Sequence, residues 1–193
     1  IYGGAAVWGT LAALKGSSDE FAVPVSESLH RVFQDYHDDI LLISKSEKLV
    51  SSRAGHSLMD GNPYATARYA QATRRTDEML TVLRQGKVER FGEILESEAL
   101  TLHALMMSSY PPYILIRPNT LTVIERIHQY RGDTGLPLYF TLDAGPNLHL
   151  LYPSSIATEV KKFIREQLLY FCEDNMYLAD RVGKGPERLD VSE

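Results

Sequence analysis

The segment from Phe140 to Tyr152, FTLDAGPNLHLLY, places two apolar stretches on either side of a short turn sequence. Both ends are predicted to be β-strands, because apolar residues there are bounded by Gly and Pro, which favour turns. Successive strand residues point to opposite faces, so Asp143 is expected opposite the apolar stripe that includes Leu138 and Leu142. From this pattern alone, Asp143 could be a turn residue or a catalytic carboxylate held at the edge of a cleft.

The overall composition excludes several classes of protein. With 193 residues, the chain can form one hydrophobic core, or one domain plus part of another. Its formal net charge of -5 gives no electrostatic reason to expect a nucleic-acid or anionic-membrane partner, and no apolar run approaches the roughly 20 residues that span a bilayer. Cys172 is the only cysteine, which is consistent with a reducing cytoplasm, and the scattered histidines predict no metal site.

The chain begins IYGGAAVWG, without Met or a secretory leader, and is interpreted as a fragment of a longer protein. A processed terminus is the alternative. The Ala- and Leu-rich stretch from Tyr2 to Leu14 predicts a helix, with Trp8 in the core. A short extended segment is expected from Phe21 to Val25, and a strand around Ile40 to Ile43.

Four further helices and a last strand follow from apolar spacing, Asn-Pro starts and Gly stops. They are expected at 62–84, 88–107, 119–130, 157–171 and 177–182. Glu98 lies on the apolar stripe of the helix expected at 88–107, and a carboxylate on a buried face needs a partner. We interpret it as a satisfied structural carboxylate and His103 as a packed histidine, whereas Arg53, Arg68 and Arg74 are expected to be solvated.

From Ile40 onwards, the predicted order is strand, helices, two strands, helix and strand. This order predicts an α+β fold: a ferredoxin-like split β-α-β arrangement with extra helices, whose antiparallel sheet is covered on one face.

Five stretches together resemble the diphosphomevalonate decarboxylase family: IYGGAAVWG, SSDEFAVPV, VSSRAGH, LTLHALMMSSYPPYI and FTLDAGPN. This family belongs to the GHMP kinase superfamily, named for galactokinase, homoserine kinase, mevalonate kinase and phosphomevalonate kinase. The resemblance implies that residues 1–37 end an N-terminal, ATP-binding lobe like ribosomal protein S5. Residues 38–193 would form the C-terminal GHMP-kinase-type lobe. The phosphate loop would lie before Ile1, so the fragment is expected to be inactive alone.

The implied reaction is the ATP-dependent decarboxylation of mevalonate 5-diphosphate to isopentenyl diphosphate, with ATP and Mg²⁺ as cofactors. By this resemblance, Asp143 is the catalytic carboxylate, and Ser51, Ser52, Arg53 and Gly55 bind substrate. The pair Ser51-Ser52 could also cap a helix. The family further implies a cytoplasmic enzyme that could form a homodimer.

One residue departs from the family pattern, since His56 stands where the family usually has Met. A mevalonate 3-kinase or a phosphomevalonate decarboxylase of the same fold is therefore an alternative, with Asp143 retained and a different anion pocket. A non-enzymatic binding module on the same scaffold is the second alternative, although an intact Asp143 argues against it.

Overall fold

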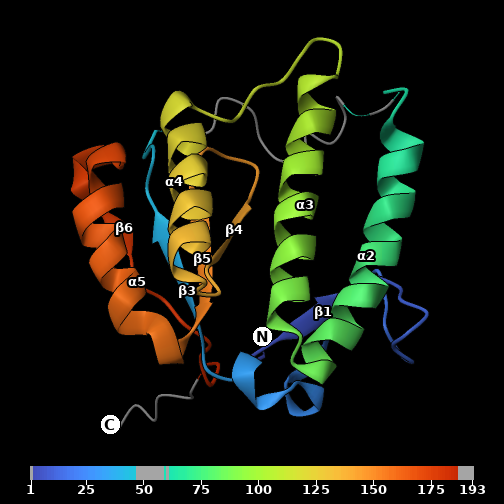
Figure 1. The fold of residues 1–193 in the computed structure, drawn as a ribbon. Coiled ribbons are helices and arrows are strands. Elements are labelled where there is room, and N and C mark those ends of the chain that lie inside the picture. The colour runs from blue at the N-terminus through green and yellow to red at the C-terminus, as the bar shows by residue number, and fades with distance from the viewer. Residues whose placement is uncertain (1, 47–58, 60, 187–193) are drawn as a thin grey trace, which may run out of the picture.

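The computed structural model describes residues 2–46, 59 and 61–186, and its centre is a four-stranded antiparallel sheet in the order β4-β5-β3-β6. Figure 1 shows helices α4 and α5 lying across one face of this sheet. The predicted α+β class, with an antiparallel sheet covered on one face, is confirmed. The bounds are β3 (Tyr36–Leu41), β4 (Tyr139–Leu142), β5 (Leu148–Pro153), β6 (Tyr177–Leu178), α4 (Pro118–Thr134) and α5 (Ala157–Phe163).

The main core lies between the sheet and these two helices. Because side chains alternate along a strand, Phe140, Leu150 and Tyr152 all reach the helix-covered face, and all three are fully buried. They pack with residues such as Val123 of α4 and Val160 of α5. Each such burial contributes roughly 1.5–3 kcal/mol before entropy is counted.

Helix α4 begins and ends as its sequence indicates. Pro118 occupies the first turn, and Gly135 ends the helix in the left-handed conformation with φ 69°. The predicted helix at 157–171 is also confirmed, but its pitch changes along its length. After α5, a π-helical stretch runs over Ile164–Leu168 and a 3-10 turn over Leu169–Phe171.

Helices α2 (Ala65–Gln85) and α3 (Val88–Met107) run side by side, and α3 contacts β4, as Figure 1 shows. At the closest approach, a Cβ added to Gly92 would lie 2.0 Å from the Tyr139 ring, so only glycine fits there. Nearby, the buried Glu96 accepts a hydrogen bond from the Phe140 backbone N–H at 3.3 Å. Glu96 also binds Arg131 at 2.7 and 3.0 Å, which ties α3 to α4.

The helix predicted from Tyr2 to Leu14 is wrong. Residues Ala6–Trp8 form strand β1, which pairs antiparallel with β2 (Ala22–Pro24). Gly4 and Gly9 have φ angles of 68° and 122°, which are incompatible with an α-helix, so strand pairing overrides the helix propensity of the alanines. The expectation for Trp8 was also wrong, because its side chain is 72% exposed.

A second apolar cluster joins this N-terminal segment to α2 and α3. Its buried members include Val25, Phe33, Leu80 and Phe91.

The predicted strand around Ile40 is β3, and the helices expected at 62–84, 88–107 and 119–130 are α2, α3 and α4. The last strand, β6, is shorter than expected. A lobe boundary at residue 38 stays a prediction. No described helix combines the length and apolarity required to cross a membrane.

Candidate functional site

Asp143 directly follows β4 and is exposed. Its backbone carbonyl accepts hydrogen bonds from His103 Nε2 at 3.0 Å and from the Gly145 N–H at 2.7 Å. The carbonyl is therefore fixed from two directions, while the residue itself remains accessible. This arrangement suits a reactive carboxylate, because a positioned group needs a backbone that does not move.

His103 connects α3 to the Asp143 turn. Its side chain is 1% exposed, and a carbonyl oxygen only accepts, so Nε2 carries the proton and donates it to Asp143. Burial lowers the pKa of His103, and the bond to the Asp143 carbonyl only partly opposes that effect. The interpretation of His103 as a packed, hydrogen-bonded histidine is confirmed. Its link to Asp143 was not predicted, because sequence spacing does not show which turn a helix residue meets.

The other end of the turn is anchored to α4 and to the segment that follows β3. The hydroxyl of the buried Thr120 donates to the Pro146 carbonyl at 2.8 Å. The Asn147 side-chain oxygen accepts from the Ser44 N–H at 3.0 Å. The Asp-Ala-Gly-Pro-Asn segment is therefore a turn held by α3, by α4 and by the segment that follows β3, and a catalytic role of Asp143 stays a prediction.

A second titratable pair lies on the sheet face that α4 and α5 do not cover. His149 of β5 is paired with Ile40 of β3 on one side and with Thr141 of β4 on the other, and all three residues are half-buried. Its Nδ1 lies 2.9 Å from an Asp38 carboxylate oxygen. That hydrogen bond is the main cause of a raised His149 pKa, and the Asp143 charge adds to it. Sequence reasoning missed this pair, because only the strand register brings it together.

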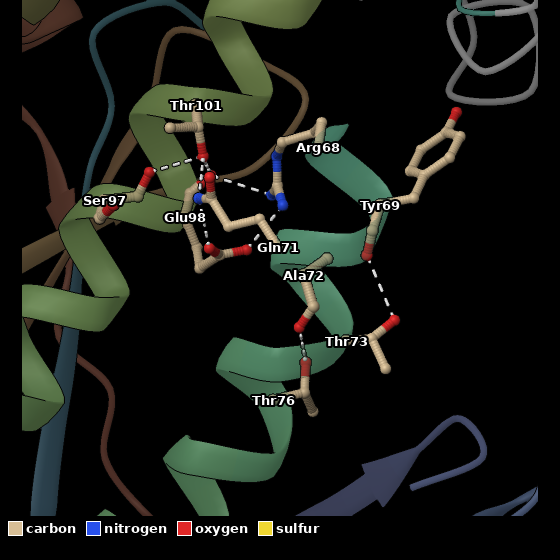
Figure 2. Close-up of polar contacts among 9 residues, drawn as sticks. All are labelled: Arg68, Tyr69, Gln71, Ala72, Thr73, Thr76, Ser97, Glu98 and Thr101. Atoms are coloured by element: carbon tan, nitrogen blue, oxygen red, sulfur yellow. Dashed lines mark hydrogen bonds and ion pairs between the residues drawn. The ribbon is translucent and has the colours of Figure 1, made fainter. Parts of the chain in front are cut away.

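Glu98 forms a polar network between α2 and α3, which Figure 2 shows. An Arg68 nitrogen lies 2.8 Å from one carboxylate oxygen, and Gln71 donates to the other at 2.9 Å. The satisfied role expected for Glu98 is confirmed. The expectation that Arg68 is solvated was wrong, because its side chain is only 11% exposed and packs between the helices.

A comparison with known protein families shows which family the chain belongs to. Residues 39–188 match the mevalonate 5-diphosphate decarboxylase C-terminal domain. The chain belongs to this family. Among curated proteins, it is 28% identical over 152 residues to a diphosphomevalonate decarboxylase of Danio rerio, which covers 76% of this chain and 37% of that protein.

Solved structures of mevalonate diphosphate decarboxylases share the fold. The Staphylococcus aureus protein has a TM-score of 0.77 at 27% identity, covering 96% of this chain and 54% of that one. A structure described as MDDEF in complex with MVAPP, AMPPCP and magnesium has a TM-score of 0.76 at 25% identity, covering 95% of this chain and 54% of that one. The chain thus spans between about a third and about half of these relatives.

Of the site residues predicted for this decarboxylase-family domain, only Asp143 lies in the described part. Ser51, Ser52, Arg53, Gly55 and His56 lie outside the described residues, so their grouping with Asp143 stays a prediction. Arg74 is exposed, as expected. Within residues 2–46, 59 and 61–186, no group of three or more His, Cys, Asp or Glu side chains could hold a metal ion.

Proposed function

We propose that the whole protein containing this chain catalyses the ATP-dependent decarboxylation of mevalonate 5-diphosphate to isopentenyl diphosphate. The family match supports this proposal, as do the names of the relatives. The observation that carries it within the fold is the exposed Asp143, on a turn fixed by His103 and Thr120. A cytoplasmic location and a homodimer are further predictions of this proposal.

In this proposal, Asp143 acts on the 3-hydroxyl of the substrate. A carboxylate next to a tertiary hydroxyl can orient it and accept its proton while the oxygen attacks a phosphoryl group. The hydrogen bond from His103 then holds the backbone of Asp143 in place, so that little conformational freedom of this residue is lost when the transition state forms. His103 is a positioning residue in this scheme, because it touches the Asp143 carbonyl and not the carboxylate.

ATP with Mg²⁺ would supply the phosphoryl group and neutralise its charge. Among the described residues, no cluster of His, Cys, Asp or Glu side chains could hold the metal ion. Binding of the diphosphate is proposed for Ser51, Ser52, Arg53 and Gly55, because the two serine hydroxyls can donate to phosphate oxygens, and the free N–H groups of a helix would add to this if one starts just after them.

The decisive experiment measures ATP consumption and carbon dioxide release by the full-length protein. Asp143→Asn keeps the shape of the side chain and should lower kcat by about 10²–10⁴-fold with little change in KM. Asp133→Asn is the matched control, because Asp133 is also exposed but lies in the last turn of α4. Near-normal turnover of a folded Asp143→Asn protein would return Asp143 to the role of a turn residue.

Substrate identity and the anion site are tested separately. The full-length protein should act on mevalonate 5-diphosphate in preference to mevalonate or its monophosphate, and the opposite order would favour one of the related enzymes. Replacing both Ser51 and Ser52 with Ala should weaken diphosphate-substrate binding more than ATP binding. If ATP affinity falls instead, these serines belong to the nucleotide site or only cap a helix. A folded full-length protein that never consumes ATP would favour a binding module.

A further inference from the structure

His149 lies next to the Asp143 turn, on the sheet face that α4 and α5 do not cover. It is paired with Thr141 of β4, and Asp143 lies two residues beyond Thr141 along the chain. Leu142, between them, belongs to the helix-covered core, so the alternation of β4 directs Thr141 and Asp143 to the open face. Residues in this diagonal relation across two antiparallel strands lie roughly 7–8 Å apart. His149 is thus a titratable neighbour of the proposed catalytic carboxylate.

Asp38 of β3 holds the His149 ring and favours its charged form. Asp38 is opposite Leu151, two residues from His149, and its carboxylate lies 2.9 Å from His149 Nδ1. A carboxylate accepts hydrogen bonds and does not donate them, so Nδ1 carries a proton. This hydrogen bond is the first cause of the raised pKa of His149, so the positively charged ring persists to a higher pH than in a free histidine. The side chain is 25% exposed, so its charge is partly shielded from water.

Within the described part of the chain, two charged residues act on His149. Asp38 and Asp143 both raise its pKa, whereas burial lowers it. From α3, His103 reaches the Asp143 turn, but burial lowers the pKa of His103 and favours its neutral form. The neighbours of His149 on its own face, across the adjacent strands and along β5, are the uncharged residues Ile40, Thr141, Asn147 and Leu151. The positive charge of His149 is therefore shared between two carboxylates.

The negative charge of the proposed substrate acts against ionisation of Asp143. Mevalonate 5-diphosphate carries a carboxylate and a diphosphate, which would come close to Asp143. A like charge disfavours the ionised form of a carboxyl group, so substrate binding opposes the state in which Asp143 can accept a proton. A positive charge at the position of His149 acts in the opposite direction. Its effect is greatest at acidic pH, where His149 is charged and a carboxylate is most readily protonated.

We propose that His149, charged through its hydrogen bond to Asp38, is a positioning residue that keeps the Asp143 carboxylate ionised while the anionic substrate is bound. It acts through Asp143 and takes no part in the making or breaking of bonds. This inference rests on the proposed function. It extends the site from the Asp143 turn onto β5 and makes the activity depend on a charge that is present at acidic pH and lost as pH rises.

The first test measures the interaction between the two side chains in the chain itself, without substrate. Nuclear magnetic resonance follows the His149 ring signals through a pH titration of the parent and of Asp143→Asn. Loss of the Asp143 charge should lower the pKa of His149 by about half a pH unit, the effect of two unit charges roughly 7–8 Å apart near a protein surface. Asp133→Asn is the matched control, because Asp133 is exposed in the last turn of α4. A His149 pKa that is unchanged by Asp143→Asn, or lowered equally by Asp133→Asn, would overturn the proposal.

The second test measures the pH dependence of kcat in the full-length protein, which reports ionisation in the enzyme–substrate complex. His149→Gln keeps a donor for Asp38 and removes the positive charge. Its acid limb should move up by about half a pH unit, so that turnover on that limb falls about threefold, while turnover above the His149 pKa stays close to that of the parent. His149→Lys restores a positive charge and should restore the limb. His128→Gln is the control and should leave the limb in place, because His128 is exposed on α4.

The outcomes separate this role from a structural one and from the proposed function. A loss of turnover that is equal at every pH and is not restored by His149→Lys would show that His149 only supports the fold, and would overturn the proposal. An active enzyme whose acid limb is unmoved by His149→Gln would also overturn it. A full-length parent that consumes no ATP would refute the proposed function and this role together, whereas the titration of His149 would still report whether the two side chains interact.

Discussion

Replacing Gly92 with Ala tests whether the contact between α3 and β4 is as close as the structure shows. The new Cβ would lie 2.0 Å from Tyr139 Cδ1 and 2.2 Å from Cγ and Cε1. Ordinary carbon contacts begin near 3.5 Å, so the ring or the helix must move by about 1.5 Å. The ring has little room to retreat, because Tyr139 is 6% exposed and the Arg131 guanidinium lies 4.8 Å from its centroid on one side.

The size of the effect follows from two opposing contributions. Overpacking of a core typically costs about 1–3 kcal/mol, and the rigid ring places this case at the upper end. Alanine also stabilises a helix interior by about 1 kcal/mol relative to glycine. We therefore expect Gly92→Ala to reduce the free energy of unfolding by about 2 kcal/mol, or the melting temperature by about 4–8 °C.

Gly132→Ala is the matched control, because Gly132 lies in α4 and an added Cβ there meets nothing within 4 Å. That change should stabilise the chain by about 0.5–1 kcal/mol. Urea unfolding followed by circular dichroism measures both variants. In a Tyr139→Leu background, the cost of Gly92→Ala should shrink, since the ring that it strikes is gone. Equal stability of Gly92→Ala and the parent chain would refute the close contact.

Three further predictions concern titratable groups. The pKa of His149 is raised in the folded chain, so its bond to Asp38 stabilises the fold at pH values below the unfolded-state pKa near 6.5. This contribution is lost as pH rises through the higher folded-state pKa. The difference in the free energy of unfolding between the parent chain and His149→Gln should therefore shrink as pH rises, and urea midpoints at several pH values measure it. Burial raises the pKa of the Cys172 thiol to about 11, so at pH 8 it should react with a thiol reagent only after unfolding, and rapid labelling of the folded chain would contradict its burial. Arg68→Met and Glu98→Leu should be coupled by about 1–2 kcal/mol in a double-mutant cycle, and purely additive effects would argue against the pair shown in Figure 2.

Sequence patterns predicted the elements whose signals are local. Helices α2, α3 and α4 follow from apolar spacing with glycine stops, and the hairpin of β4 and β5 follows from two apolar stretches around a Gly-Pro turn. The error from Tyr2 to Leu14 arose because β1 is stabilised by pairing with β2, a contact that local propensity does not register.

The candidate site was predictable only in part. The exposed position of Asp143 after a strand could be inferred from the alternation of apolar residues. The hydrogen bonds that hold the Asp143 turn could not be inferred, because His103 is 40 positions away from Asp143 in the sequence and Thr120 is 26 positions away from Pro146. The pairing of His149 with Asp38 spans 111 positions and depends on strand register, which no single stretch of sequence encodes.

The ion pair between Glu96 and Arg131 has a consequence for how molecules of this protein meet one another. β4 is an outer strand of the sheet, so its unpaired backbone groups could accept a strand from a neighbouring molecule. Glu96 takes the N–H of Phe140, and Arg131 donates to the carbonyl of Leu138 at 2.8 Å. The two side chains thus occupy the positions that a fifth strand would use. Intermolecular extension of the sheet past β4, which would be a first step of aggregation through β-structure at this edge, would have to break this ion pair before it could begin.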